Sequence, residues 1–242
     1  MTASEPATDS RWYGRRRGKK LRPGRQALVD GLLPRLRLDP ARLADQDPGT
    51  LFPEPVDDLW LEVGFGAGEH LAALAARHPQ TGFIGCEPFV NGVASLLTMI
   101  EEGGLKNVLI FDDDARLLLD HLPAASIGRI FILFNDPWPK TRHHRRRFVS
   151  PQTVECLVRL LKDDGEILFA SDHMGYIAWA LELFLRGGEL RWLAKRPSDW
   201  RRPPDGWVVT RYETKARKHG ANPVFLRFGR LPRGLRPGVG FT

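Results

Sequence analysis

The sequence contains few of the residues on which crosslinked, metal-bound or membrane-spanning folds depend. Its 242 residues include only two cysteines, Cys86 and Cys156, far apart in the chain. Such a pair encodes neither a disulfide framework nor a zinc site, so we predict no metal. The longest apolar runs, such as residues 130–134, are far shorter than the roughly 18 residues that a membrane span requires. No apolar stretch near the N-terminus is typical of a signal peptide, and we expect a cytoplasmic protein without membrane contact.

Charge is distributed unevenly along the chain. The net charge is +7, and both flanks are basic: residues 1–25 carry +6 and residues 195–236 carry +9. The segment between them carries −8, yet residues 140–147 contain five basic side chains and no acid. Arginine outnumbers lysine 28 to 8, which suits bidentate contacts to phosphates, although a GC-rich genome would also raise the arginine content. The segregation of charge favours a polyanionic ligand such as a nucleic acid.

Apolar strands and amphipathic helices alternate through the middle of the chain. Strands are predicted at residues 59–63, 82–86, 108–111, 129–134, 166–170 and 223–228. Helices are predicted at residues 26–36, 69–78, 90–101, 115–121, 151–161 and 175–185. Strands that are apolar throughout and alternate with helices form a mostly parallel sheet with helices on both faces. The pattern therefore predicts an α/β, doubly wound fold.

The same pattern predicts the domain organisation. Residues 1–25 are basic and rich in Gly and Pro, which predicts a flexible N-terminal arm. Residues 26–230 form a single predicted domain with a basic loop region at about 195–220, and residues 231–242 form a tail.

A glycine-rich turn follows the first predicted strand, in the sequence Glu62-Val63-Gly64-Phe65-Gly66-Ala67-Gly68. Glycines at a strand-to-helix turn let the backbone approach a ligand closely. The third glycine comes one residue too early for a dinucleotide fingerprint, and a carboxylate at Glu62 would repel a pyrophosphate but suits a cationic amino-acid group. The turn resembles the E/D-x-G-x-G-x-G loop of Rossmann-like S-adenosylmethionine methyltransferases. It predicts cofactor contacts from Glu62, Gly64, Gly66 and Gly68.

Two further acids follow the next two predicted strands. Glu87 is placed to accept hydrogen bonds from both ribose hydroxyls, since a carboxylate has two oxygens. Asp114 follows the third strand, where members of the resembled family place a polar residue against the adenine. The competing interpretation is a glycine-rich turn with incidental acids, but three acids at three successive strand ends favour a cofactor site.

The fourth predicted strand ends in the sequence Phe134-Asn135-Asp136-Pro137-Trp138-Pro139-Lys140. This segment resembles the F-P-D-P-W-P-K motif of the tRNA (guanine-N7-)-methyltransferases. Residues 61–66, 170–172 and 210–213 resemble three further motifs of that family, in the same order, and the resemblance covers roughly residues 55–228. It implies methyl transfer from S-adenosylmethionine to guanine N7 in tRNA, at the variable-loop guanosine. A partner subunit and the oligomeric state, monomer or homodimer, are left open.

The motif also predicts the catalytic residue. Guanine N7 has a free lone pair and no proton to lose, so the reaction requires no strong general base. A carboxylate beside the base would stabilise the positive charge that develops on the purine, and Asp136 is the candidate, with a cofactor contact in addition. Trp138 offers a surface on which an unpaired base can stack. The competing interpretation is a structural turn with a core tryptophan.

Further residues are assigned to the RNA. Trp138 and the arginines of the basic run are predicted to contact it: Arg142, Arg145, Arg146 and Arg147. The resemblance assigns substrate binding to Lys140, Asp172, Thr210, Arg211, Tyr212 and Glu213. Two structural alternatives remain. The basic run of residues 140–147 could be only a solvated surface, and Glu213 could form an ion pair with a nearby cation.

The sequence departs from the family pattern at Asn135, which replaces the usual proline, and at His173. Asn135 makes the loop more like the D/N-P-P-[YFW] motif of enzymes that methylate amines. Two alternative functions therefore stay open: methylation of an exocyclic amine of RNA or DNA, and a non-catalytic RNA-binding protein of the same fold.

Overall fold

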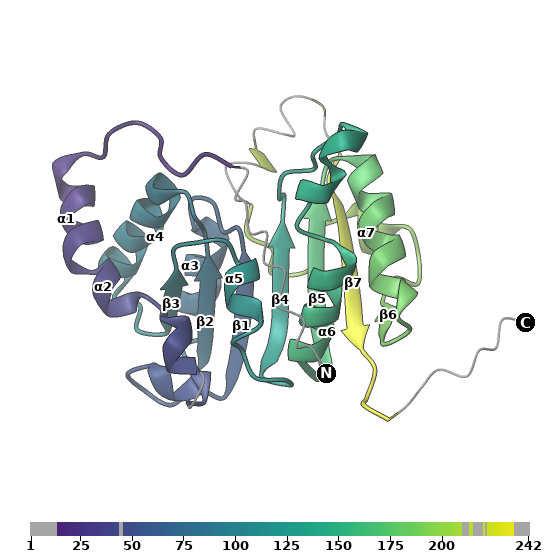
Figure 1. Ribbon diagram of the computed structural model, residues 1–242, viewed down its shortest axis with the longest axis horizontal. Helices are drawn as coiled ribbons and strands as arrows, with labels where there is room; N and C mark the ends of the chain where they lie inside the picture. Colours follow the sequence, from purple (N-terminus) through teal and green to yellow (C-terminus); the bar gives the residue numbers. More distant parts are fainter. Residues whose placement is uncertain (1–13, 44–45, 210–212, 215–219, 221, 235–242) are drawn as a thin grey trace, which may run out of the picture.

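The computed structural model describes residues 14–43, 46–209, 213–214, 220 and 222–234. The centre of this part of the chain is a seven-stranded sheet with the strand order β3-β2-β1-β4-β5-β7-β6 (Figure 1). The strands are β1 (Asp58–Val63), β2 (Thr81–Cys86), β3 (Val108–Phe111), β4 (Ile127–Leu133), β5 (Leu161–Ser171), β6 (Leu190–Trp192) and β7 (Val224–Arg230). Strands β1 to β5 are parallel, whereas β7 is antiparallel to both of its neighbours. The predicted mostly parallel α/β fold is confirmed.

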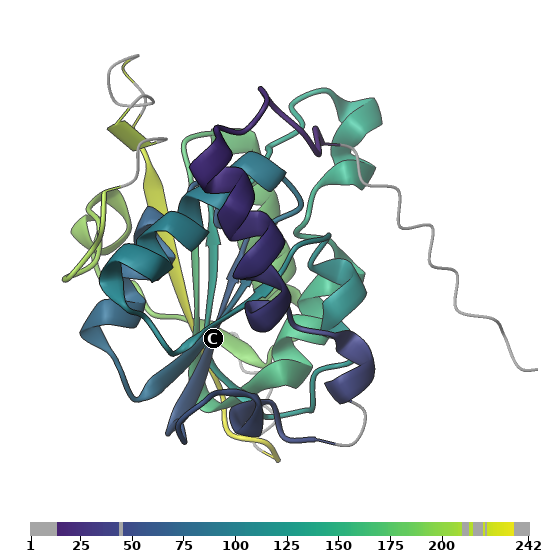
Figure 2. The ribbon, with the colours of Figure 1, turned by 90° about the vertical axis from the view of Figure 1, so that its left-hand side faces the viewer.

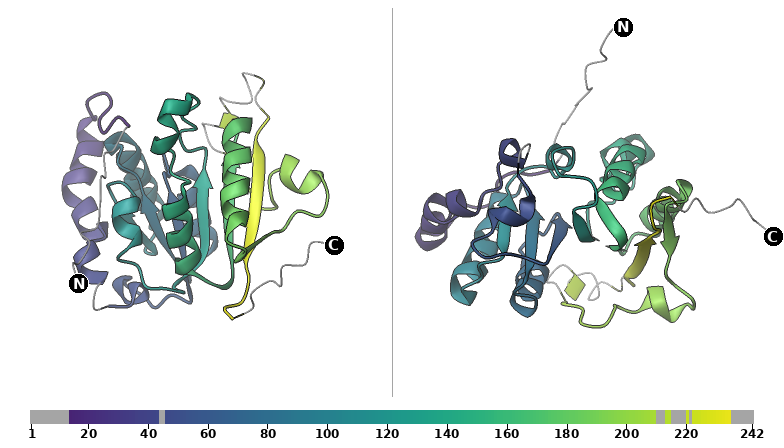
Figure 3. Two further views of the ribbon diagram at one scale, coloured as in Figure 1. Left: turned by 45° about the vertical axis from the view of Figure 1, so that its right-hand side comes forward. Right: turned by 90° about the horizontal axis from the view of Figure 1, so that it is seen from below.

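Helices cover both faces of the sheet (Figure 3). The α-helices are α1 (Pro23–Gly31), α2 (Leu33–Leu36), α3 (Glu69–Arg77), α4 (Val90–Gly103), α5 (Arg116–Leu119), α6 (Pro151–Leu160), α7 (Met174–Arg186) and α8 (Ser198–Arg201). Three short 3-10 helices are η1 (Pro40–Leu43), η2 (Pro48–Leu51) and η3 (Thr141–Arg146). Apolar side chains of α2, α3 and α4 form one core cluster with the sheet, and those of α5, α6 and α7 form a second on the other face. No described helix is long and apolar enough to cross a membrane.

The strand order reverses direction at β1, whose neighbours are β2 on one side and β4 on the other. In a doubly wound sheet this reversal opens a crevice beyond the carboxyl ends of the strands, and ligands bind there. The loops that follow β2, β3 and β4 carry Glu87, Asp114 and Asp136, so the topology brings these three acids to one edge.

Some elements differ from the prediction. The helix expected at 26–36 is divided into α1 and α2, because Pro34 has no N–H to continue the hydrogen-bond ladder. Strand β5 begins at Leu161, five residues before the predicted start, where Leu161 pairs with Ile127 across an irregularity in the register. The three-residue strand β6 was not predicted, since so short a run has no recognisable periodicity.

The described part of the N-terminal arm is attached to the domain. The carbonyl oxygen of Arg16 accepts a hydrogen bond from Val90 N at 3.0 Å. The Asn91 side chain accepts from Gly18 N and donates to the Lys19 carbonyl, both at 2.8 Å. Helix α1 then packs along α4 (Figure 2). This differs from the expected flexible arm over residues 1–25, of which residues 1–13 lie outside the described part of the chain.

Candidate active site

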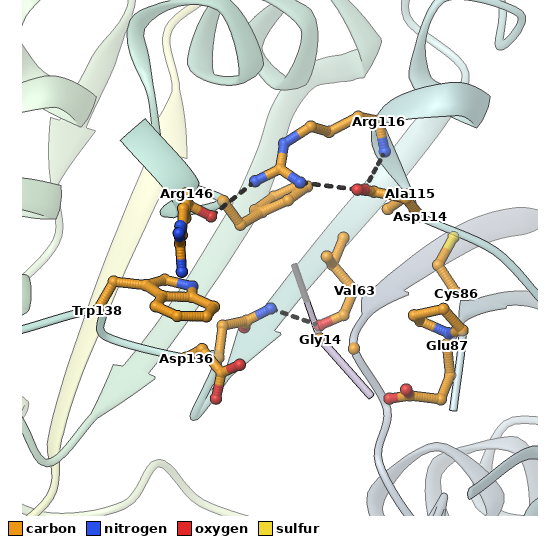
Figure 4. A pocket seen from close by; sticks show the side chains of 14 residues that line it. Gly14, Val63, Cys86, Glu87, Asp114, Ala115, Arg116, Asp136, Trp138 and Arg146 are labelled. Atoms are coloured by element: carbon orange, nitrogen blue, oxygen red, sulfur yellow. Dashed lines mark hydrogen bonds and ion pairs between the residues drawn. The ribbon is translucent and has the colours of Figure 1, made fainter. Parts of the chain in front are cut away.

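A pocket lies beyond the carboxyl ends of β1, β2, β3 and β4 (Figure 4). Residues from each of the four following loops line it, and it encloses about 570 Å³, including space open to solvent. The lining includes Gly64, Glu87, Asp114, Asn135, Asp136 and Trp138. Gly14 of the N-terminal arm also lines this pocket, so the arm contributes to its wall. Three of the four predicted acids therefore meet at one pocket.

The glycine-rich turn between β1 and α3 depends on left-handed backbone conformations. Gly64, Gly66 and Gly68 have φ values of +72°, +58° and +87°. A side chain at Gly68 would meet Leu96 at 2.8 Å in addition to the backbone strain. These conformations turn the chain sharply at the start of α3, and we call this turn the glycine cradle; of its three glycines, Gly64 lines the pocket.

Glu87 connects the loop after β2 to this cradle. One carboxylate oxygen accepts a hydrogen bond from Gly66 N and the other from Phe89 N, both at 2.9 Å. Burial raises the pKa of Glu87, the two backbone hydrogen bonds oppose that shift, and the charge of Asp136 adds to it. Each carboxylate oxygen has a second lone pair for a ligand hydroxyl.

Asp114 connects the loop after β3 to the basic segment. Its carboxylate accepts hydrogen bonds from the backbone N of Arg116 at 3.0 Å and from the guanidinium of the same residue at 2.8 Å. That guanidinium also donates to the carbonyl oxygens of Arg146 and Arg147. Arg116 was not identified from the sequence, although its position two residues after an acid at a helix start was an available signal.

Asp136 and Trp138 lie at the mouth of the pocket. Asp136 is exposed, yet partial desolvation in the pocket wall raises the pKa of its carboxyl. Trp138 has a φ of +44°, which side-chain-bearing residues rarely adopt, so the backbone of the loop is strained at this residue. The Arg146 guanidinium lies over the ring at 5.0 Å from its centre, as Figure 4 shows. The structure thus places the predicted carboxylate and aromatic surface side by side.

Glu62 is not in the pocket, which differs from the expected contact to a cationic group. Successive side chains of a strand point to opposite faces. Glu62 shares its face with Trp60, toward α3, and its carboxylate lies 2.7 Å from His70 Nδ1 with both side chains buried. The carboxylate is therefore held on the α3 side of β1, whereas Val63 and Gly64 line the pocket.

The basic run of residues 140–147 divides into outward and inward side chains. Lys140, Arg142 and Arg145 are exposed, and Arg146 is half-buried against Trp138. Arg147 is only 2% exposed, which corrects its predicted phosphate contact. Its Nε donates to the Pro137 carbonyl at 2.8 Å, and its guanidinium lies 5.2 Å from the ring centres of two aromatic residues of α7. Arg147 therefore supports the loop of residues 135–138 from the interior of the protein.

The structure treats the remaining predicted substrate-binding residues in three different ways. Asp172 follows β5 and is half-buried. Glu213 is fully buried and accepts a hydrogen bond from the Trp207 indole at 2.6 Å, so in this structure it anchors a loop and is not open to a ligand. Thr210, Arg211 and Tyr212 lie outside the described residues. Within the described residues, no group of three or more His, Cys, Asp or Glu could hold a metal ion.

Comparisons with known proteins give the family and the fold. The protein-family model Methyltransf_4, described as "Putative methyltransferase", matches residues 57–226. A solved structure of the 16S rRNA methyltransferase KamB is similar with a TM-score of 0.52 at 15% identity, over 79% of this chain and 92% of that one. At that identity the likeness shows the Rossmann-like fold alone.

Two curated relatives are much more similar in sequence, and both are named tRNA (guanine-N(7)-)-methyltransferase. The Rhodospirillum rubrum protein is 49% identical over 97% of this chain and 93% of its own length. The Nitrobacter winogradskyi protein is 48% identical over 90% of this chain and 85% of its own length. At this identity and coverage, the chain belongs to the tRNA (guanine-N(7)-)-methyltransferase family.

Proposed function

We propose that this protein transfers a methyl group from S-adenosylmethionine to N7 of a guanosine in tRNA, the variable-loop guanosine, in the cytoplasm. The observation that carries the proposal is the pocket beyond the carboxyl ends of the parallel strands. There the exposed carboxylate of Asp136 and the indole of Trp138 lie beside a glycine cradle and Glu87. Family membership supports the substrate.

The pocket residues fit the cofactor. The left-handed turn at Gly64 and Gly66 gives a close backbone approach, and the buried carboxylate of Glu87 is a suitable acceptor for two ribose hydroxyls. Asp114, held by Arg116, is the acid of the loop after β3 that lines the pocket, and it is assigned to the adenine. When bound, S-adenosylmethionine supplies a methyl group on a positively charged sulfur.

The chain's own residues then favour the transfer in two ways. During the transfer the bond from methyl to sulfur breaks and a bond to guanine N7 forms, so positive charge moves onto the purine without loss of a proton. The carboxylate of Asp136 stabilises this charge when the base lies beside it, on a loop that Arg147 holds through the Pro137 carbonyl. Trp138 holds the unpaired base by stacking, a contact worth about 1–3 kcal/mol.

The rim of the pocket supplies the contacts to the RNA backbone. Lys140, directly before η3, and Arg142 and Arg145 on η3 are exposed, and they follow the loop that carries Asp136. Cations on both sides of an extruded nucleotide can bind its flanking phosphates. Asp172 is assigned to the substrate on the family resemblance alone.

The test is direct analysis of the product. The purified protein is incubated with labelled S-adenosylmethionine and an unmodified tRNA transcript, and the labelled nucleoside is identified after digestion. We expect 7-methylguanosine. A nucleoside labelled on an exocyclic amine would instead support the alternative suggested by Asn135, and absence of labelled product would support a non-catalytic RNA-binding protein.

A further inference from the structure

Arg116, at the start of α5, joins the loop after β3 to the end of the basic segment. Its Nη1 donates to the Asp114 carboxylate at 2.8 Å. Its Nη2 donates to the carbonyl oxygens of Arg146 at 3.2 Å and Arg147 at 3.1 Å (Figure 4). The two terminal nitrogens of one guanidinium therefore bind two segments of the pocket wall that lie 30 residues apart in the chain.

This guanidinium is part of the pocket wall and not of a solvated surface. The Arg116 side chain is 30% exposed and lies over the Phe148 ring, at 5.4 Å from its centre, whereas the Asp114 side chain is only 5% exposed. Within the described residues, Arg116 is the cation that pairs with Asp114, and both residues line the pocket. Because an unpaired buried carboxylate is costly, this ion pair fixes where the Asp114 carboxylate lies.

The carbonyl groups that Arg116 binds lie at the C-terminal end of η3. A 3-10 helix has poorer hydrogen-bond geometry than an α-helix and seldom exceeds four residues, whereas η3 has six. The last carbonyl groups of a helix lack a partner within the helix, and a basic side chain can supply one. Arg116 thereby stabilises the end of the segment on which Arg142 and Arg145 are exposed.

The contacts continue from η3 to the loop of residues 135–138. Arg147, whose carbonyl oxygen accepts from Arg116, donates through its own Nε to the Pro137 carbonyl at 2.8 Å. A continuous series of hydrogen bonds therefore runs from Asp114 through Arg116 and Arg147 to Pro137, the residue after Asp136. This series connects the acid assigned to the adenine with the loop that carries the acid assigned to the developing charge.

We propose that Arg116 is a positioning residue for methyl transfer, an inference that rests on the proposed function. Through Asp114 it fixes the cofactor side of the pocket, and through η3 and Pro137 it fixes the RNA side, so that methyl group and guanine nitrogen meet in a productive geometry. A misplacement of about 1 Å can lower a rate on the order of 10²-fold, so a residue that touches no reacting atom can have a large effect. The role requires a guanidinium, because the single nitrogen of lysine cannot replace two nitrogens that face different segments.

Arg116→Lys tests this role by separating cofactor binding from the rate. Lysine can keep the ion pair with Asp114, so calorimetry should find an affinity for S-adenosylhomocysteine close to that of the wild type. The single-turnover rate, measured by rapid quench with S-adenosylmethionine and tRNA both saturating, should fall about 10- to 100-fold because the contacts to η3 are lost. Arg116→Ala should in addition weaken S-adenosylhomocysteine about 10-fold or more, since Asp114 loses its cation.

Arg159→Lys is the matched control. The Arg159 guanidinium also binds two carbonyl oxygens, those of Leu119 and Leu122 at 2.7 and 2.8 Å, but it lies outside the pocket. Its replacement should lower thermal stability and leave the saturated rate unchanged. A wild-type saturated rate in Arg116→Lys, or an equal fall in both lysine variants, would show that Arg116 is only structural and would overturn the proposal. If the wild-type protein transfers no methyl group to tRNA, the proposed function itself fails, and this inference with it.

Discussion

At the scale of single residues, Glu87 holds two backbone amides, and we propose that it also binds the cofactor. Glu87→Ala removes the acceptor of two ribose hydroxyls and also releases Gly66 N and Phe89 N. We expect cofactor affinity to fall by roughly 1.5–3 kcal/mol for each hydrogen bond to the ligand that can no longer form. Calorimetry with S-adenosylhomocysteine measures this, and wild-type affinity in the variant would reject the ribose contact.

The pH dependence of cofactor binding reports on the same carboxyl. Burial, more than the neighbouring charge of Asp136, raises the pKa of Glu87. The ionised form accepts the hydroxyls, so affinity should be full above this raised pKa and decline as the pH falls through it. The decline should begin at a higher pH than for an ordinary glutamate. In Glu87→Gln this step should be absent from the titration, and an identical step in both proteins would assign it to another group.

Asp136 is predicted to act on the rate and not on tRNA binding. Its carboxylate stabilises charge that appears only during methyl transfer, so Asp136→Ala should lower the single-turnover rate about 10²- to 10³-fold. The dissociation constant for tRNA should change little, because one carboxylate adds no attraction to a polyanion. Rapid-quench measurements with enzyme in excess separate the two quantities. Loss of tRNA binding with an intact chemical step would contradict the assignment.

At the scale of elements, we expect the exposed and the buried arginines in and next to η3 to have different roles. The exposed ones contact RNA, and the buried one supports the preceding loop. Replacing exposed Arg142 and Arg145 together by Gln should weaken binding of every tRNA and reduce its salt dependence by about 0.7–0.9 log unit for each phosphate that is no longer neutralised. Arg147→Gln should instead lower thermal stability, because its guanidinium is buried among aromatic rings and bonded to Pro137. Filter binding at several salt concentrations and thermal unfolding distinguish these effects. If Arg147→Gln and the double variant have the same effects on tRNA binding and on thermal stability, the assignment of different roles to these arginines is wrong.

The parallel strands and the helices between them were predictable because fully apolar runs and amphipathic periods are local signals. The positions of Glu87, Asp114 and Asp136 at one edge also followed, since parallel strands end together. The sequence could also have shown that the Glu62 side chain points to the opposite face of the sheet from its neighbours Leu61 and Val63, because side chains alternate along a strand. Composition could not show which arginine of residues 140–147 turns inward. The attachment of the arm to α4 joins residues over 70 positions apart, and no local pattern reports it.

At the scale of the whole molecule, two basic segments distant in sequence converge on one pocket. Gly14 of the N-terminal arm and Arg146 of η3 both line it, although the domain between them is acidic overall. The arm is fixed there by Asn91 and by an ion pair between Arg16 and Asp113 at 2.5 Å. The fold thereby places, around the carboxylates of the pocket, cations that can face a nucleic acid.

The central claim is the identity of the methylated atom, and replacing that atom tests it most directly. A tRNA is assembled with 7-deazaguanosine only at the nucleotide found to be methylated, so that C–H stands in place of N7 while the exocyclic amine is unchanged. A tRNA assembled in the same way with guanosine serves as the control, and binding of both is measured. We predict equal binding, with methyl transfer to the control and none to the deaza nucleotide. Methylation of the deaza nucleotide at its amine would contradict the account.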